Sequence, residues 1–164
     1  MAVRPRTLRP TIAADARSGR FVERRIFVDA APEAIWRMLV DPERCAQLLP
    51  EAGLGEPWSA AWPAAGSQRG AQQRMGLLRE RGRATSVEAR PGTTFWLRVE
   101  SPSLQTDWTW RLEPMAGGTR VIHVAALSAR GRIAALLVRL GGRDLGTIVE
   151  RNLSMLSRLG GAAD

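Results

Sequence analysis

A single histidine falls where the hydrophobic pattern predicts a buried apolar side chain. His123 shares one side of a predicted strand with Val121 and Ala125, so it points inward if Val121 belongs to the core. Its imidazole titrates near neutral pH and could act as a general acid or base. The alternative is a hydrogen-bonded histidine in the core or in the wall of a cavity, without a catalytic role.

Two further polar residues also fall where the hydrophobic pattern predicts a buried apolar side chain. Arg24 alternates with Ile26 and Val28, so it is expected on the inner side of the first strand, where a guanidinium could bind a ligand carboxylate or phenolate. It could also lie near the strand end and reach solvent. Asn152 stands alone on the apolar side of a C-terminal helix, where it could bond a ligand carbonyl or only a neighbouring side chain.

Tryptophans add apolar surface to the predicted strands. Each combines a large ring with one N–H donor, which suits a flat polycyclic or isoprenoid ligand, although plain core packing is the alternative. The position of Trp96 is the least defined, because Phe95 and Leu97 compete for the inner side of its strand. Of the residues expected to bind ligand, His123 and Arg24 are the candidates for catalysis. The full predicted set is Arg24, Trp96, Trp108, Trp110, His123, Leu145, Val149 and Asn152.

Other kinds of site lack the residues that they need. The one cysteine, Cys45, excludes an intrachain disulfide, and one histidine excludes histidine-cluster metal sites and zinc fingers. The glycines at 53 and 55 are followed by Pro57 and cannot open a helix as a dinucleotide site requires. We therefore expect no metal and no cofactor. The cysteine usage favours a reducing compartment, most simply the cytoplasm.

Arginine supplies every basic side chain: 24 arginines and no lysine stand against 16 acidic residues, giving a net charge of +8. Residues 1–19 are rich in arginine and are expected to form a solvated, poorly ordered tail, with contact to nucleic acid or an anionic surface as the alternative. No apolar run approaches the roughly 20 residues of a membrane helix. A second cluster could form an anion-facing edge or a solvated one: Arg69, Arg74, Arg79, Arg81 and Arg83.

The elements that must position these residues follow a recognisable order. Alternation over residues 22–28 predicts a strand, and Pro32 and Asp41-Pro42 begin two short helices. A three- and four-residue apolar period over 132–159 predicts a long helix, kinked at Gly141-Gly142. Between them turn residues divide the chain into six predicted strands, with no clear register over 56–78. These strands are residues 56–62, 70–78, 83–90, 94–100, 106–113 and 119–127.

Together these elements predict an α+β domain over residues 20–160. A seven-stranded, curved antiparallel sheet would wrap around the C-terminal helix and leave a cavity between them. The run from Ile26 to Trp36, the helix start at 41–44, residues 87–92 and the hairpin at 110–121 resemble the START-like, or SRPBCC, superfamily with its helix-grip fold. Bacterial polyketide cyclase/dehydrase-type single domains are the members that it resembles most.

The expected function is to bind or carry a hydrophobic small molecule, such as a lipid, isoprenoid or polyketide-like compound, in that cavity. The resemblance implies an alternative, an aromatase/cyclase or dehydratase acting on poly-β-ketone intermediates, with Arg24, His123 and Asn152 as the available polar groups. A second alternative is an interaction module that contacts nucleic acid or protein through its arginine-rich surfaces.

Overall fold

The computed structural model describes residues 19–75, 78–141 and 145–160, so most of the expected tail lies outside it. Six strands form one antiparallel sheet in the order β1-β6-β5-β4-β3-β2. The strands are β1 (Gly19–Val28), β2 (Gln68–Met75), β3 (Leu78–Arg90), β4 (Thr94–Glu100), β5 (Leu104–Met115) and β6 (Gly118–Ala129). The helices are α1 (Pro32–Val40), α2 (Pro42–Leu48), α3 (Arg132–Gly141) and α4 (Leu145–Gly160).

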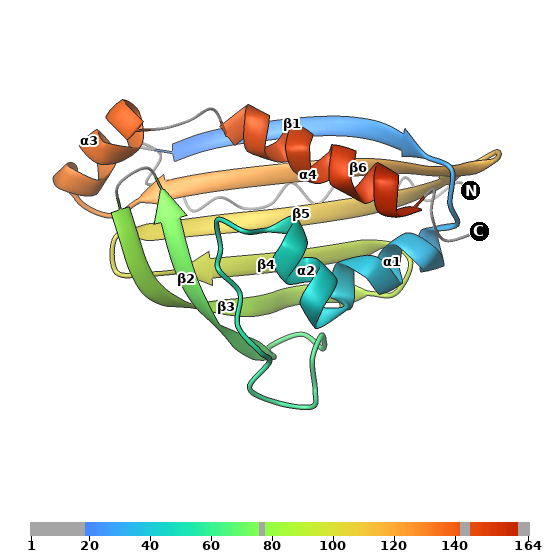
Figure 1. Ribbon diagram of the computed structural model, residues 1–164, viewed down its shortest axis with the longest axis horizontal. Coiled ribbons are helices and arrows are strands. Elements are labelled where there is room, and N and C mark those ends of the chain that lie inside the picture. The colour runs from blue at the N-terminus through green and yellow to red at the C-terminus, as the bar shows by residue number, and fades with distance from the viewer. Residues whose placement is uncertain (1–18, 76–77, 142–144, 161–164) are drawn as a thin grey trace, which may run out of the picture.

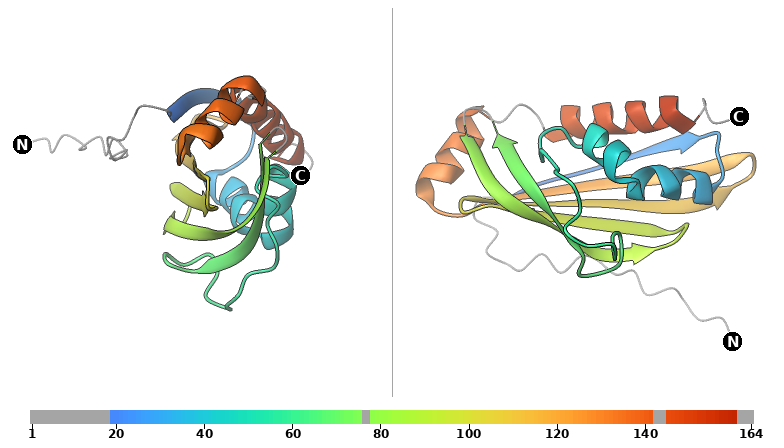
Figure 2. Two further views of the ribbon diagram at one scale, coloured as in Figure 1. Left: turned by 90° about the vertical axis from the view of Figure 1, so that its left-hand side faces the viewer. Right: turned by 60° about the horizontal axis from the view of Figure 1, so that its bottom comes forward.

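The sheet curves around the helices that cover its inner face. Figure 1 shows α4 running along β1 and β6, with α1 and α2 over the middle strands. The end-on view in Figure 2 shows the sheet curling around them. This is an α+β architecture of the helix-grip kind. No helix among the described residues is long and apolar enough to cross a membrane.

The two short helices begin where the sequence predicts. Pro32 opens α1, and Ile35 and Leu39 are buried on its inner side. The Asp41 carboxylate caps α2, because its Oδ1 accepts a hydrogen bond from the backbone N–H of Arg44 at 2.9 Å. A helix start is coded by adjacent residues, so the sequence alone locates it.

The predicted seventh strand does not form. Residues 56–62 make turns, and Pro57 forms only an isolated bridge with Arg69. Proline has no N–H to donate to a ladder, and the Trp62 indole N–H instead binds the Val40 carbonyl at 2.8 Å. The segment therefore covers the end of α1 and the edge of the sheet. The expected count of seven strands was wrong, and the sheet has six.

The predicted C-terminal helix is divided between two described helices. Helix α3 ends at Gly141 and α4 begins at Leu145, while Gly142 of the expected kink lies outside the described residues. Helix α4 packs mainly against β1, and α3 packs against the end of β6. The helix that the sheet grips is thus α4 alone, at 16 residues.

A close backbone approach accompanies the bend of β3. A Cβ atom added at Gly82 would lie 2.0 Å from the carbonyl oxygen of Glu100. No side chain fits there, because the neighbouring atoms are main-chain atoms that cannot rotate away. Glycine at this position therefore permits the close approach of β3 to the end of its antiparallel neighbour β4.

We expect Gly82→Ala to lower the free energy of unfolding by about 3 kcal/mol, since the backbones must separate to admit the methyl group. Gly55→Ala is the matched control, because its Cβ would meet nothing closer than 3.7 Å. Urea denaturation followed by circular dichroism measures both. Equal losses in the two variants would contradict the steric explanation.

Candidate functional site

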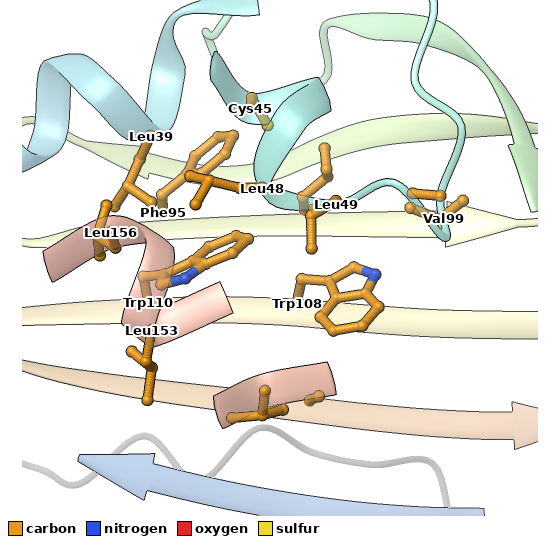
Figure 3. Packing of buried hydrophobic residues seen from close by; sticks show 14 of the residues in the cluster. Leu39, Cys45, Leu48, Leu49, Phe95, Val99, Trp108, Trp110, Leu153 and Leu156 are labelled. Atoms are coloured by element: carbon orange, nitrogen blue, oxygen red, sulfur yellow. The ribbon is translucent and has the colours of Figure 1, made fainter. Parts of the chain in front are cut away.

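A stack of aromatic rings occupies the inner face of the central strands. His123 of β6 lies opposite Trp110 of β5, and their rings are nearly parallel with centroids 4.5 Å apart. Phe95 of β4 continues the stack at 5.9 Å from Trp110, and the Trp108 ring lies 5.9 Å from that of His123. Figure 3 shows Phe95, Trp110 and Trp108 among leucines of α1, α2 and α4. The predicted inward direction of Trp108, Trp110 and His123 is what the structure shows.

The hydrogen bond of His123 determines which ring nitrogen carries the proton. Nδ1 lies 3.1 Å from the carbonyl oxygen of Thr109, and a carbonyl only accepts, so Nδ1 is the donor. Nε2 is then a bare acceptor, and it has no partner among the described residues. Burial lowers the pKa of His123 from 6.5 to about 4, against the smaller opposing effect of the Thr109 hydrogen bond. The ring is therefore neutral at pH 7.

Helix α4 covers the inner face of the sheet that carries these rings. Leu145, Val149 and Asn152 are all buried, as the sequence analysis predicts for this side of the helix. The Asn152 Oδ1 accepts a hydrogen bond from Arg151, which also forms an ion pair with Glu51. The Asn152 Nδ2 is buried and has no partner among the described residues. The Asn152 amide oxygen is thus hydrogen-bonded, whereas the amide nitrogen is a donor in apolar surroundings.

Two predicted site residues lie elsewhere. Arg24 pairs with Glu150 of α4 at 3.0 Å, but its side chain is 46% exposed, so the expected buried cation is not found at this position. Trp96 lies on the outer side of β4, where its N–H binds Asp107 and the Arg98 guanidinium covers its ring. Phe95 takes the inner position, because the alternation of β4 can place only one of these two neighbours inside.

A buried polar network was missed by the sequence analysis. The Gln73 amide donates to Thr106 at 2.5 Å, and the Ser101 hydroxyl lies within hydrogen-bond distance of Gln73 and of Glu80. Both Gln73 and Thr106 are nearly inaccessible to solvent. Thr106 lies on the same side of β5 as Trp108, two residues away, and this alternation is the sequence pattern that predicts its burial. In contrast to Asn152, the side chain of Gln73 has partners for both of its polar atoms.

Arg69 is also buried, although it was expected among the exposed arginines of its edge. Its guanidinium donates to the carbonyls of Gly55 and Pro42 and lies over the Trp62 ring, so it joins the 50–67 segment to the start of α2. Burial lowers its pKa. Burial likewise raises the pKa of the nearby Cys45 thiol to about 12, which keeps it protonated. Within the described residues no group of three or more His, Cys, Asp or Glu side chains could hold a metal ion.

The low pKa of His123 predicts that the protein loses stability in acid. The unfolded chain binds a proton near pH 6.5 and the native state only near pH 4, so stability falls as the pH drops through this interval. The difference corresponds to about 3 kcal/mol. Urea denaturation between pH 7 and pH 4 measures it, and His123→Gln should remove this part of the pH dependence. The same decline in both proteins would contradict the assignment.

Solved structures with similar folds are numerous. The TTHA0849 protein of Thermus thermophilus is 20% identical with a TM-score of 0.66, covering 88% of this chain and 99% of its own. Norcoclaurine synthase of Thalictrum flavum, solved with dopamine and hydroxybenzaldehyde, is 12% identical with a TM-score of 0.62, covering 89% of this chain and 88% of its own. The di-domain ARO/CYC protein StfQ of the steffimycin biosynthetic pathway is 14% identical with a TM-score of 0.65. The match covers 88% of this chain and 51% of StfQ.

At these identities the structural likeness shows the fold alone. No curated protein is significantly similar in sequence to this chain. A family profile nevertheless matches residues 21–159, which is nearly all of the described domain. The resemblance seen in the sequence is confirmed: the chain belongs to the family described as polyketide cyclase / dehydrase and lipid transport.

Proposed function

We propose that this domain binds or carries a neutral, hydrophobic small molecule between the inner face of the sheet and α4. A lipid, an isoprenoid and a polyketide-like compound are the classes that suit the aromatic and aliphatic side chains there. The proposed location is the cytoplasm, because the single thiol offers no disulfide.

Six buried side-chain nitrogen and oxygen atoms have no hydrogen-bond partner among the described residues, and three of them carry the proposal. They are the His123 Nε2, the Trp108 Nε1 and the Asn152 Nδ2. Buried polar atoms are nearly always hydrogen-bonded, because each unmade bond costs free energy. All three belong to strands or helix sides that face the interior. A ligand with matching polar groups would offset this cost, so these atoms are suited to recognition.

Their chemistry constrains the ligand. The His123 Nε2 is an acceptor, so it would receive a hydrogen bond from a hydroxyl or N–H. The Trp108 and Asn152 nitrogens are donors and would bind carbonyl or ether oxygens. Because His123 is neutral and Arg24 is exposed, a neutral oxygenated molecule fits better than a carboxylate. An apolar compound carrying a hydroxyl and a carbonyl meets all of these requirements.

Asn152 provides a test that needs no ligand. Asn152→Leu removes an amide whose Nδ2 has no partner among the described residues and adds apolar volume on the buried side of α4, so it should raise the free energy of unfolding by about 1 kcal/mol. Thermal and urea denaturation of the free protein measure the change.

Gln73→Leu is the matched control for this experiment. The Gln73 amide is equally buried but fully bonded, so its loss leaves the Thr106 hydroxyl without a partner among the described residues, removes one of the partners of Ser101, and should cost about 2 kcal/mol. Opposite signs for the two variants support a ligand-binding role for Asn152. A similar destabilisation in both would mean that Asn152 is structural and that the space beside it is filled.

Native mass spectrometry of protein purified from its own host should reveal a co-purified small molecule. Trp108→Phe keeps the aromatic surface but removes the N–H, so affinity for that molecule should fall about three- to tenfold. His123→Gln retains an acceptor and should change affinity less. Unaltered affinity in Trp108→Phe would exclude the indole N–H from recognition.

An enzymatic role is the second candidate, and the family description favours it by naming cyclases and dehydrases. The bare His123 Nε2 is the group that could take a proton from a substrate hydroxyl or α-carbon. A pKa of about 4 makes it a weak base at neutral pH, which ranks this role below binding. If the site is catalytic, His123→Gln should slow turnover by about 10²- to 10⁴-fold while ligand affinity is retained.

A further inference from the structure

Helix α3 presents apolar side chains to solvent as well as to the core. Ala134 and Val138 are buried against the end of the sheet. On the other side Ile133 is 78% exposed and Leu136 is 54% exposed. A surface helix normally carries polar residues on its outer side, and a helix that is apolar on all sides is usually covered. The outer side of α3 is therefore more apolar than a surface that is exposed to water normally is.

Cations without ion pairs accompany this exposed apolar side. Arg132 and Arg139 flank it on α3, and both are exposed. On the β2–β3 hairpin Arg74 and Arg79 lie opposite each other on the outer face, with Arg81 further along. None of these arginines forms an ion pair with a described residue. Two adjacent arginines repel each other, so an anionic partner would relieve a cost that the chain alone does not offset.

The helix and the hairpin lie at one end of the molecule. Figure 1 and the right-hand view of Figure 2 both place α3 and the tip end of β2 and β3 at the same end of the long axis, away from the Met115–Gly118 turn. The described carboxylates of this end are already engaged. Glu80 accepts hydrogen bonds from Ser101 and Ser103, and Glu100 pairs with Arg130. Among the described residues, the unpaired charge at this end is therefore positive.

We propose that this end of the protein docks on an anionic membrane surface, with Ile133 and Leu136 entering the interface and the arginines contacting lipid headgroups. A lipid interface offers both of the required chemistries within a few ångströms: negative charge and an apolar layer. Nucleic acid would satisfy the arginines but would leave Ile133 and Leu136 in water. This inference goes beyond the proposed cavity ligand and does not depend on it.

Vesicle co-sedimentation of the full-length protein tests the proposal. Vesicles of phosphatidylcholine with phosphatidylglycerol should bind the protein, those of phosphatidylcholine alone should bind it at least tenfold less, and added salt should weaken binding. Ile133→Ser with Leu136→Ser should reduce binding to the anionic vesicles by about tenfold or more. Arg132→Gln with Arg139→Gln should reduce it by about 25-fold, at about fivefold for each arginine.

Two matched control variants test whether the loss of vesicle binding is specific to the side chains of α3. Trp58→Ser with Met115→Ser removes two exposed apolar side chains elsewhere, and Arg44→Gln with Arg158→Gln removes two exposed arginines on α2 and α4. Both controls should leave vesicle binding within about twofold of the unmodified protein. The exposed positions of Ile133 and Leu136 mean that the α3 variants should unfold at an unchanged temperature.

Several outcomes would overturn the proposal. One is binding that does not distinguish anionic from neutral vesicles, and another is binding retained in the Ile133/Leu136 double variant. If replacing Arg4, Arg6 and Arg9 with glutamine abolishes binding while the α3 variants do not, the N-terminal arginines are responsible. Loss of vesicle binding in the presence of duplex DNA, insensitive to Ile133 and Leu136, would indicate a nucleic-acid surface. Self-association that disappears in the double variant would indicate a contact between copies of the chain.

Discussion

Covering the inner face of a strongly curved sheet is the constraint on which the other features of this domain depend. The chain meets it from both ends, with α1 and α2 arriving after the first strand and α4 after the last. Leu39, Leu48, Leu153 and Leu156 converge on the aromatic stack from these helices (Figure 3). Gly82 lets β3 lie close to the end of its neighbour β4. Because the sheet curves around these helices, its central side chains are shielded from water.

That shielding determines the electrostatics of the interior. Burial keeps His123 neutral, the Thr109 carbonyl holds its proton on Nδ1, and desolvation likewise keeps the Cys45 thiol protonated. Polar groups in such surroundings either bond to one another or remain unsatisfied. The Gln73 amide belongs to the first class, and it stabilises the end of the sheet near Ser101. The Asn152 Nδ2 belongs to the second class among the described residues, and this is the reason that we propose it as a ligand donor.

Arginine has three distinct physical roles in this chain, although its abundance suggests one. Arg69 is buried and hydrogen-bonded to main-chain carbonyls, where it fixes an irregular segment. Arg24 forms a half-exposed ion pair at the rim, a contact of small energetic value. Arg132 and Arg139 are exposed beside bare apolar side chains and form no ion pair with another described residue. The net charge therefore does not predict the role of an arginine, because that role depends on the residues around its guanidinium in the fold.

The sequence by itself determined what depends on neighbouring residues: the starts of α1 and α2, the alternation that turns Trp108, Trp110 and His123 inward, and the helical period that places Asn152 on a buried side. It could not decide what depends on distant segments. Periodicity states which side of a strand a residue occupies but not whether another segment covers that side, so the exposure of Arg24 and the burial of Arg69 came only from the fold. The loss of the seventh strand has the same cause, because Pro57 interrupts the ladder while Trp62 binds the distant Val40 carbonyl and lies under the Arg69 guanidinium. The partners of His123, Gln73 and Asn152 were likewise decided by tertiary structure, since hydrogen bonds join atoms that only the folded sheet and helix bring together.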